Sequence, residues 1–430
     1  MSATPERHSA PPVLPGWDDV YAKSLDCVHC GLCLQACPTY RETGSEVSSP
    51  RGRIHLMRSV AEGRFPLAGV LAEEAYLCLG CRACETACPS GVRYGAMVDQ
   101  VRREVEREGL RRGLARRLEA FALHRVIPHR RRLALAFDLL ALVERTRLDR
   151  LALALLPASL RDARALAPRV PPRRERAFPP ERIAASGERR GRVGFFVGCV
   201  MPQLFGAVSA ATLRVLAANG FEVVVPRDQG CCGALHAHAG DAAQARELAR
   251  HNAKAFAAAG VDAVVVDSAG CGAALREAAQ WLPEEGRALA DSVRDVCELL
   301  HAEGLRPPEG RVEARVCYDD PCHLVHAQRI RAAPRALLEQ IPGLHLVPHD
   351  EPEACCGAAG IYNLSHPAMA RAVLERKLRA LAAADPDVVA SGNPGCMMQL
   401  RAGLRRAGLR ARVVHPVELL DEAYRAAEVS

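Results

Sequence analysis

Eight cysteines in the first quarter of the chain occur in two runs with the same spacing. The first run is Cys27, Cys30, Cys33 and Cys37, followed by Pro38, and the second is Cys78, Cys81, Cys84 and Cys88, followed by Pro89. Both read C-x2-C-x2-C-x3-C-P, the ferredoxin pattern in which three thiolates bind one 4Fe-4S cluster and the fourth binds the other. The spacing therefore predicts two clusters, one held by Cys27, Cys30, Cys33 and Cys88 and one held by Cys78, Cys81, Cys84 and Cys37.

Structural zinc and disulfide bonds are the alternatives for these cysteines. A zinc site takes four ligands from two separated C-x2-C pairs, whereas each run here places four cysteines within eleven residues. Disulfides belong to oxidising compartments, and the printed sequence opens without an apolar leader segment, so we expect a cytoplasmic chain with reduced thiols. The spacing favours iron-sulfur clusters.

Most of the remaining cysteines form a repeat. Cys199 corresponds to Cys322, Cys231-Cys232-Gly233 to Cys355-Cys356-Gly357, and Cys271 to Cys396, at separations of 123, 124 and 125 residues. Such constant separations indicate two copies of one domain. The four cysteines of each copy could hold a further iron-sulfur centre or form a redox-active dithiol, and the alternative is that the adjacent pairs are buried packing residues. Cys297 and Cys317 have no counterpart in the repeat, so we expect them in the core.

Each copy alternates short apolar runs with helical segments. The predicted strands cover residues 192–198, 221–226 and 263–268 in the first copy and 314–320, 344–349 and 387–391 in the second. That order predicts a small parallel sheet flanked by helices, with the cysteines at the carboxyl ends of the strands, where open α/β sheets bind ligands. The predicted fold is thus a multidomain mixture of α+β and α/β structure. We expect a helical ferredoxin-type domain with two 4Fe-4S clusters at 1–100, a helical Arg-rich connector at 101–190, and α/β modules at 191–306 and 307–430.

The connector carries most of the positive charge. Residues 101–190 hold 23 Arg and 11 acidic residues, a net +12, whereas the whole chain is only +7. This stretch is either a solvated helical face or a docking surface for an acidic partner or anionic lipid. Nucleic acid is a poor partner because no aromatic residues alternate with the arginines.

Residues 193–213 are uncharged and long enough to cross a membrane. Pro202 and several polar residues interrupt them, which favours a strand, a turn at Gly198 and a helix instead. We therefore expect no transmembrane helix and at most peripheral membrane association.

The sequence holds neither a strand-linked G-x-G-x-x-G nor a G-x4-G-K-[ST] motif, so no nicotinamide, flavin or nucleotide site is predicted. Iron-sulfur clusters move single electrons and need a flavin between them and a hydride donor. We therefore predict an electron-transfer subunit with no catalytic residues of its own, working with a flavin-carrying partner.

Three segments together resemble the iron-sulfur subunit of glycolate oxidase, also called glycolate dehydrogenase. They are CVHCGLCLQACPTY from Cys27, SPRGRIHLM from Ser49, and CLGCRACETACPSGVRYG from Cys78, and the resemblance extends over essentially the whole chain. It implies FAD-binding partner subunits that oxidise glycolate to glyoxylate, and a quinone or similar membrane acceptor for the electrons. It also leaves open a position at the inner face of the cytoplasmic membrane.

The repeated modules resemble the cysteine-rich CCG domains related to heterodisulfide reductase, with one departure. Those domains typically end in C-x2-C, but here Gly-Ala-Ala follows Cys271 and Met-Met-Gln follows Cys396. The fifth cysteine is missing in both copies, so whether the modules bind clusters is open. Two other functions also remain open: the iron-sulfur subunit of a lactate or glycerol 3-phosphate dehydrogenase, and a heterodisulfide-reductase-like thiol reductase.

Overall fold

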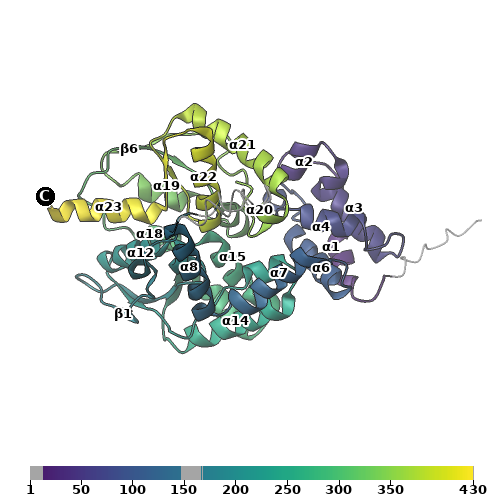
Figure 1. Ribbon diagram of the computed structural model, residues 1–430, viewed down its shortest axis with the longest axis horizontal. Helices are drawn as coiled ribbons and strands as arrows, with labels where there is room; N and C mark the ends of the chain where they lie inside the picture. Colours follow the sequence, from purple (N-terminus) through teal and green to yellow (C-terminus); the bar gives the residue numbers. More distant parts are fainter. Residues whose placement is uncertain (1–12, 147–165, 167, 430) are drawn as a thin grey trace, which may run out of the picture. The chain divides into compact units, whose positions relative to one another are not determined.

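The computed structural model describes residues 13–146, 166 and 168–429. The chain divides into two compact units, one ending at Arg111 and one beginning at Arg112 (Figure 1). The domain boundaries expected at residues 100, 190 and 306 stay predictions, and part of the expected connector, residues 147–165 and 167, lies outside the described residues.

The first unit is helical, and its loops carry the two cysteine runs. Its buried apolar residues, among them Val20, Met57, Leu71 and Met97, form one core between the helices. Helix α3 begins sharply because the Ser49 side chain accepts a hydrogen bond from the Gly52 amide at 3.0 Å. The elements are α1 (Asp18–Leu25), α2 (Pro38–Thr43), the 3-10 helix η1 (Glu46–Ser48), α3 (Pro50–Ala61), α4 (Val70–Leu77), α5 (Ala83–Thr86) and α6 (Tyr94–Arg107).

The second unit contains two sheets. The strand order is β1-β3-β2-β4-β5 in the five-stranded sheet and β7-β6-β8-β9 in the four-stranded sheet, and every pairing is parallel except that of β1 with β3. The strands are β1 (Arg182–Ile183), β2 (Gly191–Phe196), β3 (Phe221–Val224), β4 (Ala263–Val266), β5 (Val293–Asp295), β6 (Ala314–Tyr318), β7 (Leu344–Leu346), β8 (Val388–Ala390) and β9 (Arg412–Val414).

Helices pack around these sheets. Those of the region before the sheets and of the first copy are α7 (Leu114–Phe121), the π-helix η2 (Ala122–Val126), α8 (Arg130–Arg145), the 3-10 helix η3 (Arg173–Arg176), α11 (Met201–Leu204), α12 (Gly206–Ala218), α13 (Ala234–His238), α14 (Ala242–Ala257), α15 (Ala269–Arg276), α16 (Ala278–Trp281), α17 (Glu285–Ser292) and α18 (Val296–Ala302). Those of the second copy are the π-helix η4 (His323–Ala327), α19 (Ala332–Leu338), α20 (Tyr362–Ser365), α21 (Pro367–Ala384), α22 (Pro394–Ala407) and α23 (Pro416–Val429).

The predicted fold class is confirmed. All six predicted strands form. The strands β2, β4, β6 and β8 are short, mostly buried apolar runs, as parallel strands are, whereas β3 and β7 are partly exposed. The short strands β1, β5 and β9 were not expected from the sequence. One hydrophobic core extends over both sheets and includes Cys297 and Cys317, where the sequence analysis placed them.

Residues 193–213 form most of β2, α11 and α12, as expected. Among the described residues, no helix is both long enough and apolar enough to span a bilayer.

Candidate metal centres

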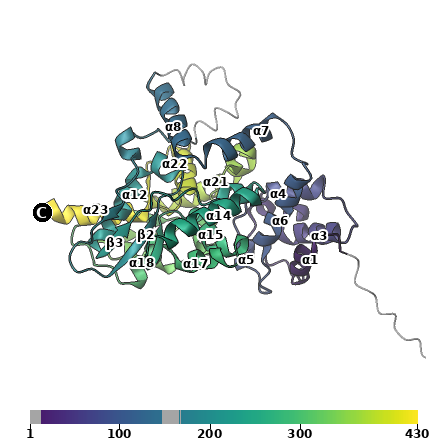
Figure 2. The ribbon, with the colours of Figure 1, turned by 90° about the horizontal axis from the view of Figure 1, so that it is seen from below.

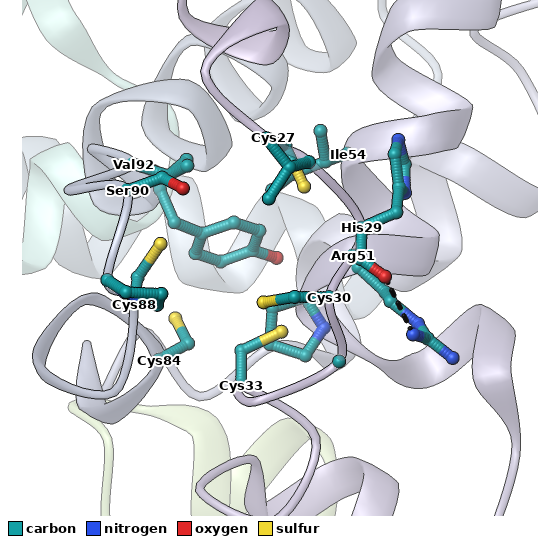
Figure 3. Close-up of a pocket in the computed structure, with 15 residues that line it drawn as sticks. Cys27, His29, Cys30, Cys33, Arg51, Ile54, Cys84, Cys88, Ser90 and Val92 are labelled. Atoms are coloured by element: carbon teal, nitrogen blue, oxygen red, sulfur yellow. Dashed lines mark hydrogen bonds between the residues drawn. The ribbon is translucent and has the colours of Figure 1, made fainter.

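The two cysteine runs meet at one cavity in the first unit. Figure 3 shows the side chains of Cys27, Cys30, Cys33, Cys84 and Cys88 turned toward a shared space. Cys30 is exposed, Cys84 is buried and the other three are half-buried. The structure thus brings Cys88 of the second run beside Cys27, Cys30 and Cys33, and these four are the set predicted for one cluster. Cys84 of the second run lines the same cavity.

The other predicted set also gathers. Cys37, Cys78, Cys81 and Cys84 are all buried. Burial raises the pKa of the Cys84 thiol well above its usual value, and the neighbouring charges of Cys81, Cys78 and Cys37 raise it further. Cys84 therefore lies close to its predicted partners while it also faces the first set, as expected where two clusters lie near each other.

The donor set at this cavity suits an iron-sulfur cluster. The residues lining it provide five thiols and no carboxylate, and soft thiolate ligands select iron-sulfur clusters. All eighteen cysteines lie in described segments and each is a free thiol, which removes the disulfide alternative from this structure. Within the described segments, no group of three His, Cys, Asp or Glu side chains is arranged around one point as a single bound ion requires.

Arginines of α3 and α6 position these cysteine loops. Arg51 donates to the carbonyl oxygen of His29 at 3.0 Å and so ties α3 to the first loop (Figure 3). The buried Arg53 donates to Glu74 at 2.8 Å and to the Thr39 hydroxyl at 3.1 Å, next to Cys37. Arg102 donates to the carbonyl oxygen of Cys78 at 2.6 Å. His29 itself is an exposed loop residue with φ of 55°.

The first repeated module collects its four cysteines beyond the carboxyl ends of β2, β3 and β4. Cys231 hydrogen-bonds with Cys199 and Cys232, and Cys232 with Cys271, so the four thiols form a chain. The hydrogen bond from Cys199, followed by that from Cys232, lowers the pKa of Cys231 well below its usual value. The site can therefore hold one thiolate that its neighbouring thiols stabilise.

His236 lies beside this chain. Its ring is buried, and Nε2 donates to the Leu123 carbonyl oxygen at 2.9 Å. Burial alone would lower the pKa of His236, but the neighbouring Cys231 and the hydrogen bond to Leu123 raise it.

The second module repeats the arrangement at β6, β7 and β8. Cys322 hydrogen-bonds with Cys355, Cys355 with Cys356, and Cys356 with Cys396, in the same order along the chain as in the first module. Two thiols now have a pKa well below the usual value: Cys322, because of Cys355, and Cys356, because of Cys355 and Cys396. His323 Nδ1 lies 3.5 Å from the sulfur of Cys322, the first of these four thiols. In the first module, His236 instead lies beside Cys231, the second thiol.

The glycine after each adjacent cysteine pair has a structural reason. Gly233 and Gly357 have φ of +88° and +85°, a left-handed conformation that side chains disfavour. A Cβ atom at these positions would also meet the carbonyl oxygen of Ala245 at 3.3 Å or of Ala370 at 2.4 Å. A turn that requires glycine thus holds the adjacent cysteines against helix α14 in the first module and against helix α21 in the second.

The two thiol sites face each other across the junction of the modules. The Ala269 amide donates to the Gly392 carbonyl oxygen at 3.0 Å, and the Gly270 amide donates to Asn393 Oδ1 at 3.1 Å. Ala269 and Gly270 directly precede Cys271, and Gly392 and Asn393 lie four and three residues before Cys396. The rings of His238 and His323, one from each module, stand edge to face with centroids 5.6 Å apart. The cysteine edges of both sheets therefore point into one region.

Sequence reasoning missed a buried ion pair beside the second thiol site. Lys377 and Asp319 are both fully buried and form an ion pair, and Lys377 also donates to the Pro352 carbonyl oxygen at 3.0 Å. Burial alone would lower the pKa of Lys377, but the Asp319 carboxylate raises it. A signal was present: Lys377 is one of only three lysines in an arginine-rich chain. Arg53 was also missed as a buried residue, although it lies in the quoted segment that begins at Ser49.

The chain is similar to known proteins along nearly its whole length. Residues 23–92 match the family described as "4Fe-4S dicluster domain", and residues 193–276 and 316–401 match "Cysteine-rich domain". The "Probable glycolate oxidase iron-sulfur subunit" of Bacillus subtilis is 36% identical, with 93% of this chain and 94% of the relative aligned. The "Glycolate oxidase iron-sulfur subunit" of Escherichia coli is 34% identical, with 92% and 93% aligned. A subunit of the fumarate reductase (CoM/CoB) of Methanothermobacter marburgensis is 29% identical, with 94% of this chain and 73% of the relative aligned.

Proposed function

The chain belongs to the family of glycolate oxidase iron-sulfur subunits, and from that premise we propose that it relays electrons from flavoprotein subunits oxidising glycolate to a quinone-type acceptor. Its first unit is a 4Fe-4S dicluster domain. When bound, 4Fe-4S clusters carry one electron at a time, which suits a relay. The chain's own residues provide the thiolates, their spacing and the surrounding charge.

One observation carries this proposal: cysteines that are far apart in the sequence line one cavity, with Cys88 beside Cys27, Cys30 and Cys33. That arrangement supports the crossed ligand sets. In the proposal, Cys27, Cys30, Cys33 and Cys88 hold the first cluster, and Cys78, Cys81, Cys84 and Cys37 hold the second.

The thiol sites of the two modules form the later part of the proposed relay. Four hydrogen-bonded thiols in each site can bind a metal centre or cycle between dithiol and disulfide. The proposed site residues are Cys199, Cys231, Cys232 and Cys271 in the first module, and Cys322, Cys355, Cys356 and Cys396 in the second.

The partners follow from what the clusters need. Glycolate oxidation removes two electrons, and a flavin can pass these singly to a cluster, so we place FAD on the partner subunits. Eighteen free thiols suit a reducing compartment, which supports a cytoplasmic location. A quinone acceptor would bring the complex to the inner face of the cytoplasmic membrane.

The test is electron paramagnetic resonance on the tagged chain, purified anaerobically together with its native partners. We expect glycolate to produce the signals of reduced clusters and buffer to produce none. Signals with lactate or glycerol 3-phosphate, but not with glycolate, would show that the complex oxidises one of those compounds instead of glycolate. Disulfide reduction by the isolated chain, together with silence toward all three substrates, would favour the thiol reductase instead.

Two variants test the ligand assignment in the same preparation. Cys30→Ser and Cys81→Ser should each remove one cluster's iron and stop electron delivery, while flavin reduction by glycolate continues. Cys317→Ala is the matched control, because this buried thiol lies in the hydrophobic core, apart from both sites. Full transfer to quinone by either serine variant would contradict the relay.

A further inference from the structure

Helices α7 and α8 form an outer layer of the second unit. Figures 1 and 2 show both helices on the same side of that unit. They begin the second unit and come before its first strand. Each is anchored by one buried leucine, Leu123 in η2 directly after α7, and Leu133 in α8.

Helix α8 has apolar residues on two opposite faces. Its inner face consists of the buried Leu133 and, one and two turns on, the half-buried Phe137 and Leu140. Its outer face carries Leu135, Leu139 and Leu142, at i, i+4 and i+7, which are 58%, 56% and 56% exposed. A surface helix needs one apolar stripe to pack on its protein. The second stripe of α8 contributes nothing to the described core.

Helix α7 repeats this pattern. Leu114, Leu118 and Phe121 again follow i, i+4 and i+7, and they are 72%, 60% and 60% exposed. Leu123, two residues after Phe121 and thus on roughly the opposite side of the helix, is buried. Two consecutive helices therefore present large apolar side chains outward, a feature that marks an interaction site in a soluble domain.

The charged residues of these two helices also leave an excess of positive charge on the surface. Residues 113–146 contain seven arginines and three acidic residues. Arg117, Arg125, Arg131, Arg132 and Arg145 are exposed. All three acids have partners: Glu119 pairs with Arg116 of the same helix at 3.8 Å, Asp138 pairs with Arg173 and Arg176 at 2.5 Å each, and Glu144 accepts from the Val170 amide at 3.1 Å. The outer surface is thus apolar and positively charged.

We propose that α7 and α8 dock the chain on an anionic lipid bilayer, with the leucines and Phe121 in the acyl region and the arginines at the headgroups. Interfacial helices have this composition, with Leu and Phe on one face and cationic side chains flanking them. The outer stripes contain no Tyr, Trp or Met, three of the residue types enriched in the cores of protein interfaces. A bilayer needs no such residues and matches the positive charge.

This docking rests on the proposed function, because its purpose would be to bring the electron relay to a quinone in the membrane. Lipid binding itself is measured without turnover, so the two proposals are tested separately. The experiment is flotation of the purified full chain, with its clusters, on vesicles of phosphatidylcholine with or without phosphatidylglycerol. We expect binding to the phosphatidylglycerol vesicles only, and weaker binding as salt is raised. Absence of binding to these vesicles would overturn the docking while leaving the electron relay untouched.

Two variants identify the surface. Leu135→Ser, Leu139→Ser and Leu142→Ser combined should weaken vesicle binding by about ten-fold or more, since each replaces apolar side chain that the bilayer would bury. Arg117→Gln combined with Arg131→Gln should weaken binding and reduce its dependence on salt. Leu364→Ser, at a leucine of α20 that is also exposed, is the matched control and should bind as the unaltered chain does.

The unfolding midpoint provides the folding check, and the leucine variant should keep it because its residues are solvent-exposed. Unchanged vesicle binding by that variant would overturn the proposal. Normal vesicle binding combined with loss of the flavoprotein subunits would also overturn it and would assign the surface to a protein partner.

Discussion

The two cysteine-rich modules have the same scaffold but different buried charges. In each, a central strand pairs in parallel with two neighbours, β2 with β3 and β4, and β6 with β7 and β8. In each, four thiols form a chain in the same order beyond those strands. The duplication preserved the sheet and the thiols, so the differences around them show what distinguishes the two sites.

The buried aspartate has moved from one strand to another. In the first module, Val197 follows the first strand and Asp267 follows β4; in the second, Asp319 follows the first strand and Ser391 follows β8. The facing helix differs too. Asn252 lies seven residues after Ala245, which packs on Gly233, and Lys377 lies seven residues after Ala370, which packs on Gly357. The second module therefore has an aspartate-lysine pair where the first has valine and asparagine.

These changes give the two sites different electrostatics. Asp267 accepts hydrogen bonds from Ser209 at 3.1 Å and Thr212 at 3.4 Å, and no cation of the described residues forms an ion pair with it. Burial raises its pKa to about 7. In the second module, the charge of Lys377 acts on Cys356 in addition to the hydrogen bonds of Cys355 and Cys396, and the pKa of Cys356 is lowered. The second site is thus better suited to hold negative charge on sulfur than the first.

The largest expected effect comes from breaking both thiol chains. Cys231 and Cys355 each contact two thiols of their chain. We expect Cys231→Ala with Cys355→Ala to slow transfer from glycolate to quinone by about ten-fold or more, because metal or redox sites lose that much when a supporting group is removed. The signals of the two ferredoxin-type clusters should remain.

The single variants then compare the modules directly. If Cys355→Ala alone reproduces the loss, only the second site takes part in the relay. Cys297→Ala, at a core cysteine, is the control. Unchanged turnover in the double variant would mean that these cysteines are packing residues.

A smaller but still large effect is expected from removing the charge that distinguishes the second module. Lys377→Met leaves Asp319 buried without its cation, which costs about 3–5 kcal/mol of the free energy of unfolding. Asn252→Ala in the first module removes a partly buried hydrogen bond from the Gly230 amide and a buried one to the Cys231 carbonyl oxygen. We expect this to lower the free energy of unfolding by about 1–3 kcal/mol.

Urea unfolding in a Trp17→Phe background measures both, since Trp281 is then the only tryptophan and lies in the second unit. Equal losses in the two variants would show that the ion pair contributes no more than an ordinary buried amide.

The parts of this protein that sequence predicts well are those encoded by local spacing. The motif C-x2-C-x2-C-x3-C-P specifies a cluster-binding loop within eleven residues. Constant separations between cysteines reveal the repeat without any knowledge of the helices between them. Apolar runs such as Ala263–Val266 predict buried parallel strands for the same reason.

What the sequence did not predict depends on contacts between distant segments. Lys377 and Asp319 are 58 positions apart, and neither has a local pattern that distinguishes a buried ion pair from a solvated charge. Arg53 reaches Glu74 through the packing of α3 on α4. The strands β1, β5 and β9 have two or three residues each, too few for a periodic signal, and form because a longer strand or sheet edge is available to pair with.

The pH dependence of stability should separate the two modules further. Because the folded pKa of Asp267 is about 7, against about 4 for an unfolded aspartate, the folded state binds the extra proton between these values. This group therefore lowers stability as pH rises from about 4 to about 7, by at most about 1.4 kcal/mol per pH unit.

Asp267→Asn should flatten that part of the curve, and its advantage over the unaltered chain should grow with pH up to about 7. Asp295, whose pKa burial also raises to about 7, remains in both proteins, and its charge contributes to the raised pKa of Asp267. A constant offset for Asp267→Asn would contradict the raised pKa.

The smallest effect is expected at the ion pair that joins the modules. Arg214 of α12 donates to both carboxylate oxygens of Asp421 of α23, each at 2.7 Å, but half of the arginine side chain is exposed. Exposed pairs contribute about 1 kcal/mol or less, so Arg214→Ala should cost no more than that. Leu420→Ala, one residue from Asp421 and fully buried in the core that both modules share, should cost about 2–5 kcal/mol. If the arginine variant lost as much as the leucine variant, the modules would be held together by charge, and their shared core would not be what keeps the two thiol sites facing each other.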